Sequence, residues 1–262
     1  IGVMKTLQNA GIPIDFMSGA SMGAIVAGLY CAGVSIERLE LEALSFSKPH
    51  HLIKLIDFSP PRRGLIRGEK VKDLLFDILD KDYQIDQLKI PLAITAVNLK
   101  NSQEVCLNSG SLIDAMLASS AVPGLFDPII IENQTLVDGS VLNNLPVDLV
   151  RKMGAELIIA VDVNFFYENQ ASWEEPFVAS RLNSFLPAIF KDIYQAEMIM
   201  VSALTENKLK QHKPDFLIRP KIPFDVNIFM GFNYADKIIT AGEEMAQSFI
   251  TQIIEQVNSY KN

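Results

Sequence analysis

With 262 residues, of which 49% are hydrophobic, the chain can bury a large core, and we expect one compact domain over residues 1–262. Acidic side chains outnumber basic ones by 31 to 23, and the resulting net charge of -8 argues against a nucleic-acid partner, because phosphate binding needs a clustered basic surface. The two cysteines, Cys31 and Cys106, are too few for a disulfide framework and lack metal-ligand spacing, so we expect two core residues in a reducing compartment.

The predicted elements alternate between short β-branched runs and longer helical ones, which is typical of parallel βα units and of an α/β fold. Near the start of the chain we expect a helix over Ile1 to Ala10, a strand over Ile14 to Ser18, and a helix over Met22 to Ala32 that Gly33 ends. A strand, a tight turn and a helix thus follow one another within a short stretch.

The rest of the chain continues this alternation. Its predicted elements are helices over Ile36 to Ser47 and Glu69 to Asp80, strands over Pro91 to Asn98 and Glu104 to Leu107, a helix over Ser111 to Ser120, a hairpin of Ile129 to Ile131 and Thr135 to Val137, a strand over Leu157 to Val163, a helical stretch opened by Trp173 to Pro176, a strand over Phe216 to Arg219 and a helix over Tyr234 to Tyr260. The apolar run at Leu157 to Val163 is typical of a central parallel strand. The proline-rich segment between Ser47 and Glu69 is expected to be a loop.

Gly19-Ala20-Ser21-Met22-Gly23 has the G-x-S-x-G pattern of a nucleophile elbow, a sharp turn between a strand and a helix that pushes a serine hydroxyl out of the fold. Glycine is expected on both sides because a Cβ at Gly19 or Gly23 would collide with neighbouring backbone. The helix would begin at Met22, whose N–H could then donate to an oxyanion. The simpler interpretation is a helix start in which Ser21 is only a cap.

A serine nucleophile needs a neighbouring group that accepts its proton, and histidine is the usual one. The chain has three histidines, His50, His51 and His212, and none follows an apolar strand. Asp138-Gly139-Ser140 instead offers a carboxylate at the exit of a predicted strand, with a glycine that permits close backbone approach. Taken alone, an Asp-Gly pair is also a common β-turn.

Together these motifs resemble the patatin-like phospholipase family, in particular its bacterial branch related to neuropathy target esterase. The resemblance covers about residues 1 to 165. Other segments carry it too: Ile1 to Asp15 is similar to the family's helix and strand before the elbow, Ala118 to Phe126 with Pro128 to its mid-chain segment, and Asn143, Asn144 and Pro146 to the residues after its catalytic aspartate.

The resemblance implies a three-layer α/β fold with a central, mostly parallel sheet flanked by helices. It also implies a Ser-Asp dyad without histidine, in which Ser21 is the nucleophile, Asp138 accepts its proton and Gly139 supports the aspartate. The implied reaction is the cleavage of acyl chains from (lyso)phospholipids or related lipid esters, with no cofactor and no metal. We expect the Ser21 hydroxyl and the Asp138 carboxylate to meet within hydrogen-bonding reach at the mouth of a shared cavity.

Two features depart from the family pattern. Ser140 stands where a second glycine or alanine is more usual, which is a small change. The family's glycine-rich loop before the first helix supplies further oxyanion donors, and we expect it to be missing, with Gly2 as its last remnant. Loss of an oxyanion donor typically lowers a rate by about 10²- to 10³-fold. The alternative to an active hydrolase is therefore a catalytically impaired lipid-binding or scaffold protein with the same fold.

No stretch reaches the roughly 18 uncharged apolar residues that a membrane-spanning helix needs, so we expect a cytoplasmic protein, with peripheral membrane contact left open. Because the chain opens at Ile1, a leader peptide is left open as well. Two aromatic-rich groups could line an acyl channel, although core packing is the simpler interpretation: Phe165, Phe166 and Tyr167, and Phe224, Phe229, Met230 and Phe232. The oligomeric state and the preference for hydrolysis over acyl transfer are left open.

Overall fold

The computed structural model describes residues 1–48, 51, 54–57, 64–163, 188–222 and 234–260. Helices in these ranges are α1 (Gly2–Asn9), α2 (Met22–Cys31), α3 (Ile36–Ser45), α5 (Glu69–Leu79), the 3-10 helix η1 (Ile85–Gln87), α6 (Leu112–Ser119), α7 (Ser140–Asn143), α8 (Val147–Lys152), α9 (Ala188–Gln211) and α10 (Ala235–Ser259). Strands are β1 (Met17–Gly19), β2 (Gly64–Ile66), β3 (Leu92–Asn98), β4 (Gln103–Leu107), β5 (Gly124–Phe126), β6 (Ile129–Ile131), β7 (Gln134–Asp138), β8 (Ile159–Val161) and β9 (Phe216–Ile218).

Five strands form the central sheet, in the order β1, β3, β7 and β6, with β4 also paired to β3. β1 runs parallel to β3, and the other three pairs in this sheet are antiparallel. Two of those antiparallel pairs, β3 with β4 and β6 with β7, join strands that are neighbours in sequence, and only antiparallel strands can be connected by a tight turn. Parallel pairing also joins β2 to β5 and β8 to β9, in two separate two-stranded sheets.

β1 and β7 lie end to end along one edge of β3. Ile94 of β3 pairs with Gly19 of β1, Ala96 pairs with Asp138 of β7, and both β3 residues also pair with β4. Since a strand residue has one neighbour on each side, β1 and β7 share the edge of β3 that faces away from β4. β1 is parallel and β7 antiparallel to β3, so their carboxyl ends point at each other. The register therefore brings Gly19 and Asp138 together.

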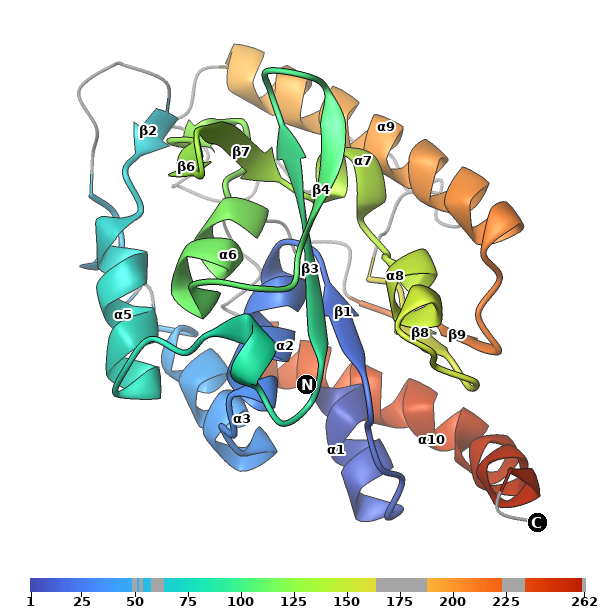
Figure 1. Cartoon of the computed structure of the whole chain (residues 1–262). Helices are drawn as coiled ribbons and strands as arrows, with labels where there is room; N and C mark the ends of the chain where they lie inside the picture. The colour runs from blue at the N-terminus through green and yellow to red at the C-terminus, as the bar shows by residue number, and fades with distance from the viewer. Residues whose placement is uncertain (49–50, 52–53, 58–63, 164–187, 223–233, 261–262) are drawn as a thin grey trace.

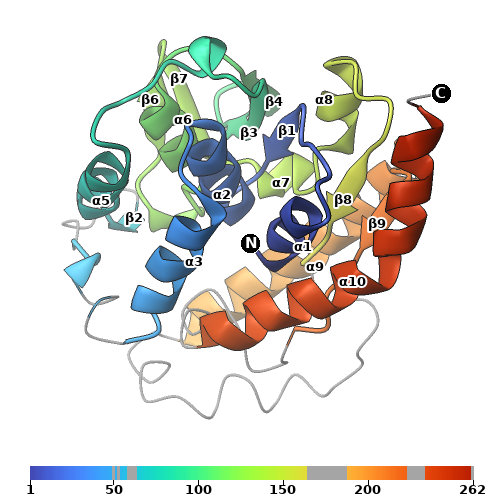
Figure 2. The same ribbon diagram turned by 90° about the horizontal axis from the view of Figure 1, so that it is seen from below.

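Helices cover both faces of the central sheet (Figures 1 and 2). Ile94 and Ala96 pack into the apolar core beneath α2 and α6. The side chain between them in sequence, Thr95, points to the opposite face and donates a hydrogen bond to the Asn143 carbonyl of α7, against which α9 packs. The sheet thus lies between α2 and α6 on one side and α7 with α9 on the other.

α10 packs alongside α1, near the N-terminus of the chain (Figure 2). A Cβ on Gly2 would lie 2.0 Å from the Ile239 carbonyl oxygen, so the close approach of the two helices requires glycine at this position. Lys5 of α1 forms ion pairs of 2.9 Å with Glu40 of α3 and with Glu243 of α10. Gly2 therefore has a packing role in this fold.

The predicted α/β class is confirmed, and most predicted helices and strands agree with the structure to within two residues at either end. β1 differs because it begins at Met17 rather than Ile14. Its pairing with β3 starts at Leu92, and the Met17 N–H donates to the carbonyl of Pro91. The extent of this short strand is set by its partner, which the apolar pattern of Ile14 to Ser18 does not reveal.

Three expectations are wrong. The apolar run at Leu157 to Val163 supplies β8, which is parallel to its neighbour as expected but pairs with β9 outside the central sheet. The segment expected to be a loop contains β2, where a Cβ on Gly64 would lie 2.4 Å from the backbone of Phe126 in β5. Cys106 is exposed on β4, a strand with a single described neighbour, whereas Cys31 is buried as expected. The helical stretch expected from Trp173 to Pro176 lies outside the described residues.

Candidate active site

Ser21 occupies the turn between β1 and α2. Its backbone has φ 52° and ψ -127°, and a positive φ is uncommon for any residue other than glycine. Strained backbone of this kind persists only where surrounding contacts hold it, and it is concentrated at functional sites. Ser21 is partly exposed and the next residue, Met22, is 49% exposed, so solvent reaches the turn.

The two glycines of the motif have different roles. A Cβ on Gly19 would lie 2.5 Å from the Gly23 carbonyl oxygen and 2.7 Å from the Ala24 nitrogen, so only glycine fits where β1 meets the start of α2. A Cβ on Gly23 would meet nothing within 4 Å. The expectation that both positions exclude a Cβ is thus correct for Gly19 and wrong for Gly23, whose Cβ direction points into open space.

Asp138 ends β7 and is almost completely buried. Its Oδ2 accepts a hydrogen bond of 2.6 Å from the Ser21 hydroxyl, and its Oδ1 accepts one of 2.8 Å from the Ser140 N–H. Burial raises the pKa of Asp138, against the opposing effect of its hydrogen bonds with Ser21 and Ser140. The bond from Ser140 to Oδ1 therefore orients the carboxylate, and Oδ2 faces the serine hydroxyl. Burial gives the carboxylate a higher proton affinity than it would have in water.

The glycine after Asp138 is required by close packing. A Cβ on Gly139 would lie 2.2 Å from Oγ1 and 2.3 Å from the carbonyl oxygen of Thr95, in the middle of β3. The chain turns here from β7 into α7, and only a residue without a side chain can pass this close to β3. Position 139 therefore has no room for a side chain beside β3.

α7 is anchored behind the aspartate by Asn143. Its side-chain amide donates to Glu104 Oε1 at 2.6 Å and to Asp148 Oδ1 at 2.9 Å. Lys208 of α9 in turn donates to Glu104 at 2.7 Å. Asn143 is almost completely buried, and its bond to Asp148 is shielded from water, so the α7 turn is held against β4 and α8.

Two residues near Asp138, Ser119 and Glu197, were not predicted from the sequence to belong to the site. Ser119, the last residue of α6, accepts a hydrogen bond from the Gly139 N–H through its carbonyl. Glu197 of α9 has its pKa raised to about 7, mainly by burial and also by the negative charge of Asp138. Ser119 lies in the Ala118 to Phe126 segment that resembles the family. The resemblance marks this segment but does not say what Ser119 does. Glu197 gives no signal in a long helix with several acidic residues.

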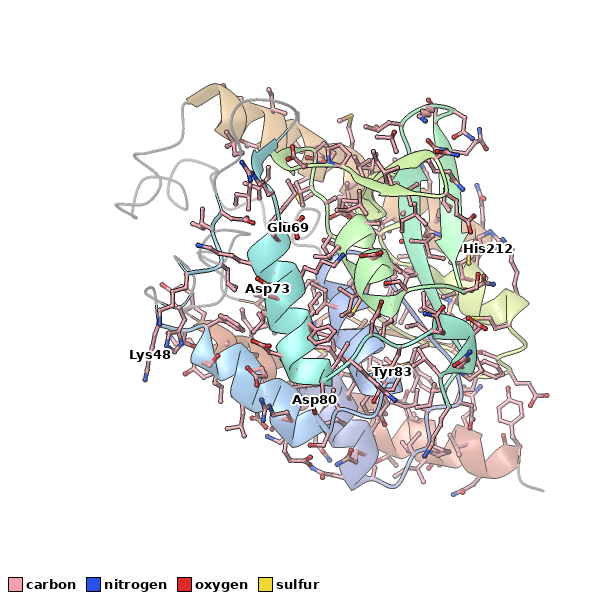
Figure 3. All side chains as sticks on the ribbon, turned by 60° about the vertical axis from the view of Figure 1, so that its left-hand side comes forward. Lys48, Glu69, Asp73, Asp80, Tyr83 and His212 are labelled. Atoms are coloured by element: carbon pink, nitrogen blue, oxygen red, sulfur yellow. The ribbon has the colours of Figure 1, made fainter. Side chains whose placement is uncertain are left out.

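Histidine does not contact the serine within the described part of the chain. His51 Nδ1 is 2.8 Å from the Ser45 carbonyl, and His212 follows the end of α9 at the outer edge of the molecule (Figure 3). His50 lies outside the described residues. Among the residues that are described, no group of three or more His, Cys, Asp and Glu side chains is arranged to hold a metal ion.

Neither of two hollows formed by described residues has Ser21 or Asp138 in its lining. The larger, of about 420 Å³, is lined by Leu99, Lys100, Pro123, Gly124, Phe126, Pro128, Thr135 and Val137. The smaller, of about 180 Å³, lies between α5, α6 and β6. Neither of these two hollows is therefore the shared cavity expected at the dyad. Both aromatic-rich groups expected at an acyl channel, Phe165 to Tyr167 and Phe224 to Phe232, lie outside the described residues.

The chain is similar to a protein family and to several individual proteins. The model of the patatin-like phospholipase family matches residues 1–151. An uncharacterized NTE family protein of Mycobacterium tuberculosis is 33% identical over 180 residues, which cover 69% of this chain and 49% of that protein. The neuropathy target esterase of Drosophila melanogaster is 32% identical over 169 residues, 62% of this chain and 12% of the esterase.

A third relative matches nearly the whole chain. A lysophospholipase of Emericella nidulans is 26% identical over 98% of this chain and 17% of its own length. The chain therefore spans about half the length of the mycobacterial relative and a smaller part of the two others. None of the described helices combines the length and the apolar composition that crossing a bilayer requires.

Proposed function

This chain belongs to the patatin-like phospholipase family, and we propose that it is a carboxylic ester hydrolase that cleaves acyl chains from lipids, with Ser21 as nucleophile and Asp138 as the base. The observation that carries this proposal is the hydrogen bond of 2.6 Å from the Ser21 hydroxyl to Asp138 Oδ2. A direct bond of this kind gives the serine proton an acceptor without histidine. The strained backbone of Ser21, at a turn that solvent reaches, also supports the proposal.

In the first half of the reaction, Ser21 Oγ attacks the ester carbonyl carbon while its proton passes to Asp138 Oδ2. The carbonyl oxygen becomes an oxyanion, which would lie at the N-terminus of α2, where the helix dipole favours negative charge. No backbone acceptor for the Met22 N–H is found among the described residues, so this N–H is available to the oxyanion. The intermediate then expels the alcohol, which takes the proton from Asp138, and leaves an acyl group on Ser21.

In the second half, a water molecule attacks the acyl carbon and gives a proton to the Asp138 carboxylate. Collapse of the intermediate releases the fatty acid, and Ser21 Oγ recovers the proton from Asp138. Burial suits the aspartate to both steps, because a carboxylate with a raised pKa accepts a proton more readily. The site therefore returns to its starting state after consuming one ester and one water.

(Lyso)phospholipids are the substrate class that we propose. The names of two relatives, a lysophospholipase and a neuropathy target esterase, support this choice. Such substrates lie in membranes and micelles, so peripheral contact with a lipid surface forms part of the proposal. The described residues present the serine at a solvent-accessible turn, as an ester embedded in a lipid surface requires.

Hydrolysis by the purified chain tests this proposal. p-Nitrophenyl esters and lysophosphatidylcholine serve as substrates, with fatty-acid release as the readout. We expect turnover by the wild type, none by Ser21→Ala, and unchanged turnover by Ser248→Ala, which removes an exposed serine on α10. Absence of turnover in the wild type would support the alternative of a catalytically impaired lipid-binding protein. Turnover by Ser21→Ala would exclude this serine as the nucleophile.

A further inference from the structure

Ser119 forms hydrogen bonds with Ser21 and with Gly139, the residue that follows Asp138. Its hydroxyl oxygen accepts a hydrogen bond of 2.9 Å from the Ser21 N–H, and its carbonyl oxygen accepts one of 3.2 Å from the Gly139 N–H. The side chain is completely buried at the C-terminal end of α6. One residue therefore joins the nucleophile's backbone to the backbone that follows the aspartate.

The neighbouring Ala121 completes the connection. Its carbonyl oxygen accepts a hydrogen bond of 3.0 Å from the Asp138 N–H. The segment that leaves α6 thus holds Asp138, Gly139 and Ser21 through three separate bonds. Two of these bonds use carbonyl groups that any residue would supply, whereas the bond to Ser21 uses a side chain. Only this third bond depends on the identity of residue 119.

The bond to Ser21 acts at a strained position. Ser21, with φ 52° and ψ -127°, immediately precedes α2. Its N–H has no acceptor within that helix, because the first N–H groups of a helix have no partner inside it. A buried N–H without an acceptor is unfavourable, so the Ser119 hydroxyl stabilises the conformation that projects Ser21 Oγ toward Asp138. Without that acceptor, the elbow can relax toward conformations in which the serine is turned away from the carboxylate.

We propose that Ser119 is a positioning residue that aligns Ser21 with Asp138 by accepting the Ser21 N–H. This inference rests on the proposed function, because alignment matters only if the dyad reacts. Small displacements of a reacting group are sufficient to lower rates by about 100-fold, whereas substrate binding does not depend on this internal bond. Loss of the hydroxyl should therefore lower kcat and leave KM nearly unchanged.

The neighbouring serine provides a matched control. Ser120 has a buried hydroxyl for which no hydrogen-bond partner is found among the described residues. Ser119→Ala and Ser120→Ala thus remove the same atom from adjacent buried positions, but only the first removes the bond to Ser21. Ser119→Cys adds an intermediate case, because a thiol has nearly the same size and is a weaker acceptor.

The experiment measures kcat and KM on a p-nitrophenyl ester for the wild type and the three variants, with each kcat normalised to active sites titrated by a fluorophosphonate. We expect kcat to fall about 10- to 100-fold in Ser119→Ala and less in Ser119→Cys, with KM within about twofold, and no change in Ser120→Ala. A wild-type kcat per titrated site in Ser119→Ala would overturn the inference, as would an equal loss in Ser120→Ala. An inactive wild type would instead overturn the proposed function, and this inference with it.

Discussion

The Ser21 hydroxyl donates a hydrogen bond of 2.6 Å to Asp138 Oδ2, although 117 positions separate the two residues in the chain. The register of three strands explains this contact. β1 and β7 meet end to end along β3, so the carboxyl end of β7, at Asp138, lies next to the turn that follows β1. Backbone pairing thus brings Ser21 and Asp138, the proposed nucleophile and base, together, and Gly19 and Gly139 let the backbone approach closely enough.

Asp138→Asn should separate activity from stability. The amide keeps the size of the carboxylate but cannot take a proton, so we expect ester turnover to fall by about 10²- to 10⁴-fold. Burial raises the pKa of Asp138 in the folded protein. Ionisation of this carboxyl therefore destabilises the fold increasingly as pH rises from the ordinary pKa of aspartate to the raised one, and the effect is absent below the ordinary pKa. The variant should therefore have a higher Tm than the wild type at pH 8 and little gain near pH 4. An equal gain at both pH values would contradict this explanation.

Gly19→Ala and Gly23→Ala should differ sharply. The first places a Cβ 2.5 Å from a carbonyl oxygen, so we expect a marked loss of Tm and of activity. The second fills open space within a helix, where alanine is favoured over glycine by about 1 kcal/mol. Thermal unfolding of both variants checks the contrast, with Tm unchanged or raised for Gly23→Ala. Similar losses in the two variants would show that the elbow is not limited by space at Gly19.

Glu197→Gln should remove a titration near neutral pH. Burial, together with the charge of Asp138, raises the pKa of Glu197 to about 7, so its ionisation destabilises the fold increasingly between its ordinary pKa and pH 7. We expect the Tm difference between Glu197→Gln and the wild type to be larger at pH 8 than at pH 5. An inflection near pH 7 in the wild-type pH–rate profile should also disappear in the variant. A profile identical in the two proteins would place this titration elsewhere.

The two cysteines should react at very different rates. Cys106 is exposed, whereas Cys31 is buried and its pKa is raised by burial to about 12. We expect one thiol per chain to react with iodoacetamide in the native protein at pH 8, and the second only in denaturant. Native Cys106→Ser should not react. A fast reaction at Cys31 would indicate that α2 opens readily from the core.

The sequence predicts the two residues of the proposed dyad because the motifs that contain them are local. A glycine before a serine at a strand–helix turn, and an Asp-Gly pair after a strand, each need particular residue types at fixed spacing. The choice of Asp138 rather than a histidine as the expected proton acceptor follows from the same reasoning, since His50, His51 and His212 all lie in polar or proline-rich segments. Helix bounds such as those of α2 and α6 are predicted well because caps and periodicity are also local.

What depends on distant contacts is not predicted. Ser119 acts on Ser21 across 98 positions, and a buried serine in an apolar helix has no pattern that reveals its partner. β8 shows the same limit, because an apolar run predicts a buried strand without saying which sheet that strand joins. β2 is not predicted because the reason for its glycine, Gly64, is the close backbone of Phe126, which belongs to a distant part of the chain.

Mass spectrometry of the chain after reaction with a fluorophosphonate tests the pairing of Ser21 with Asp138 most directly, because this probe modifies only an activated serine. We expect a single adduct on the peptide that contains Ser21, its absence in Ser21→Ala, and a rate of formation in Asp138→Asn that is lower by at least about 100-fold. An adduct on any other residue, or labelling of Asp138→Asn at the wild-type rate, would contradict the proposed dyad.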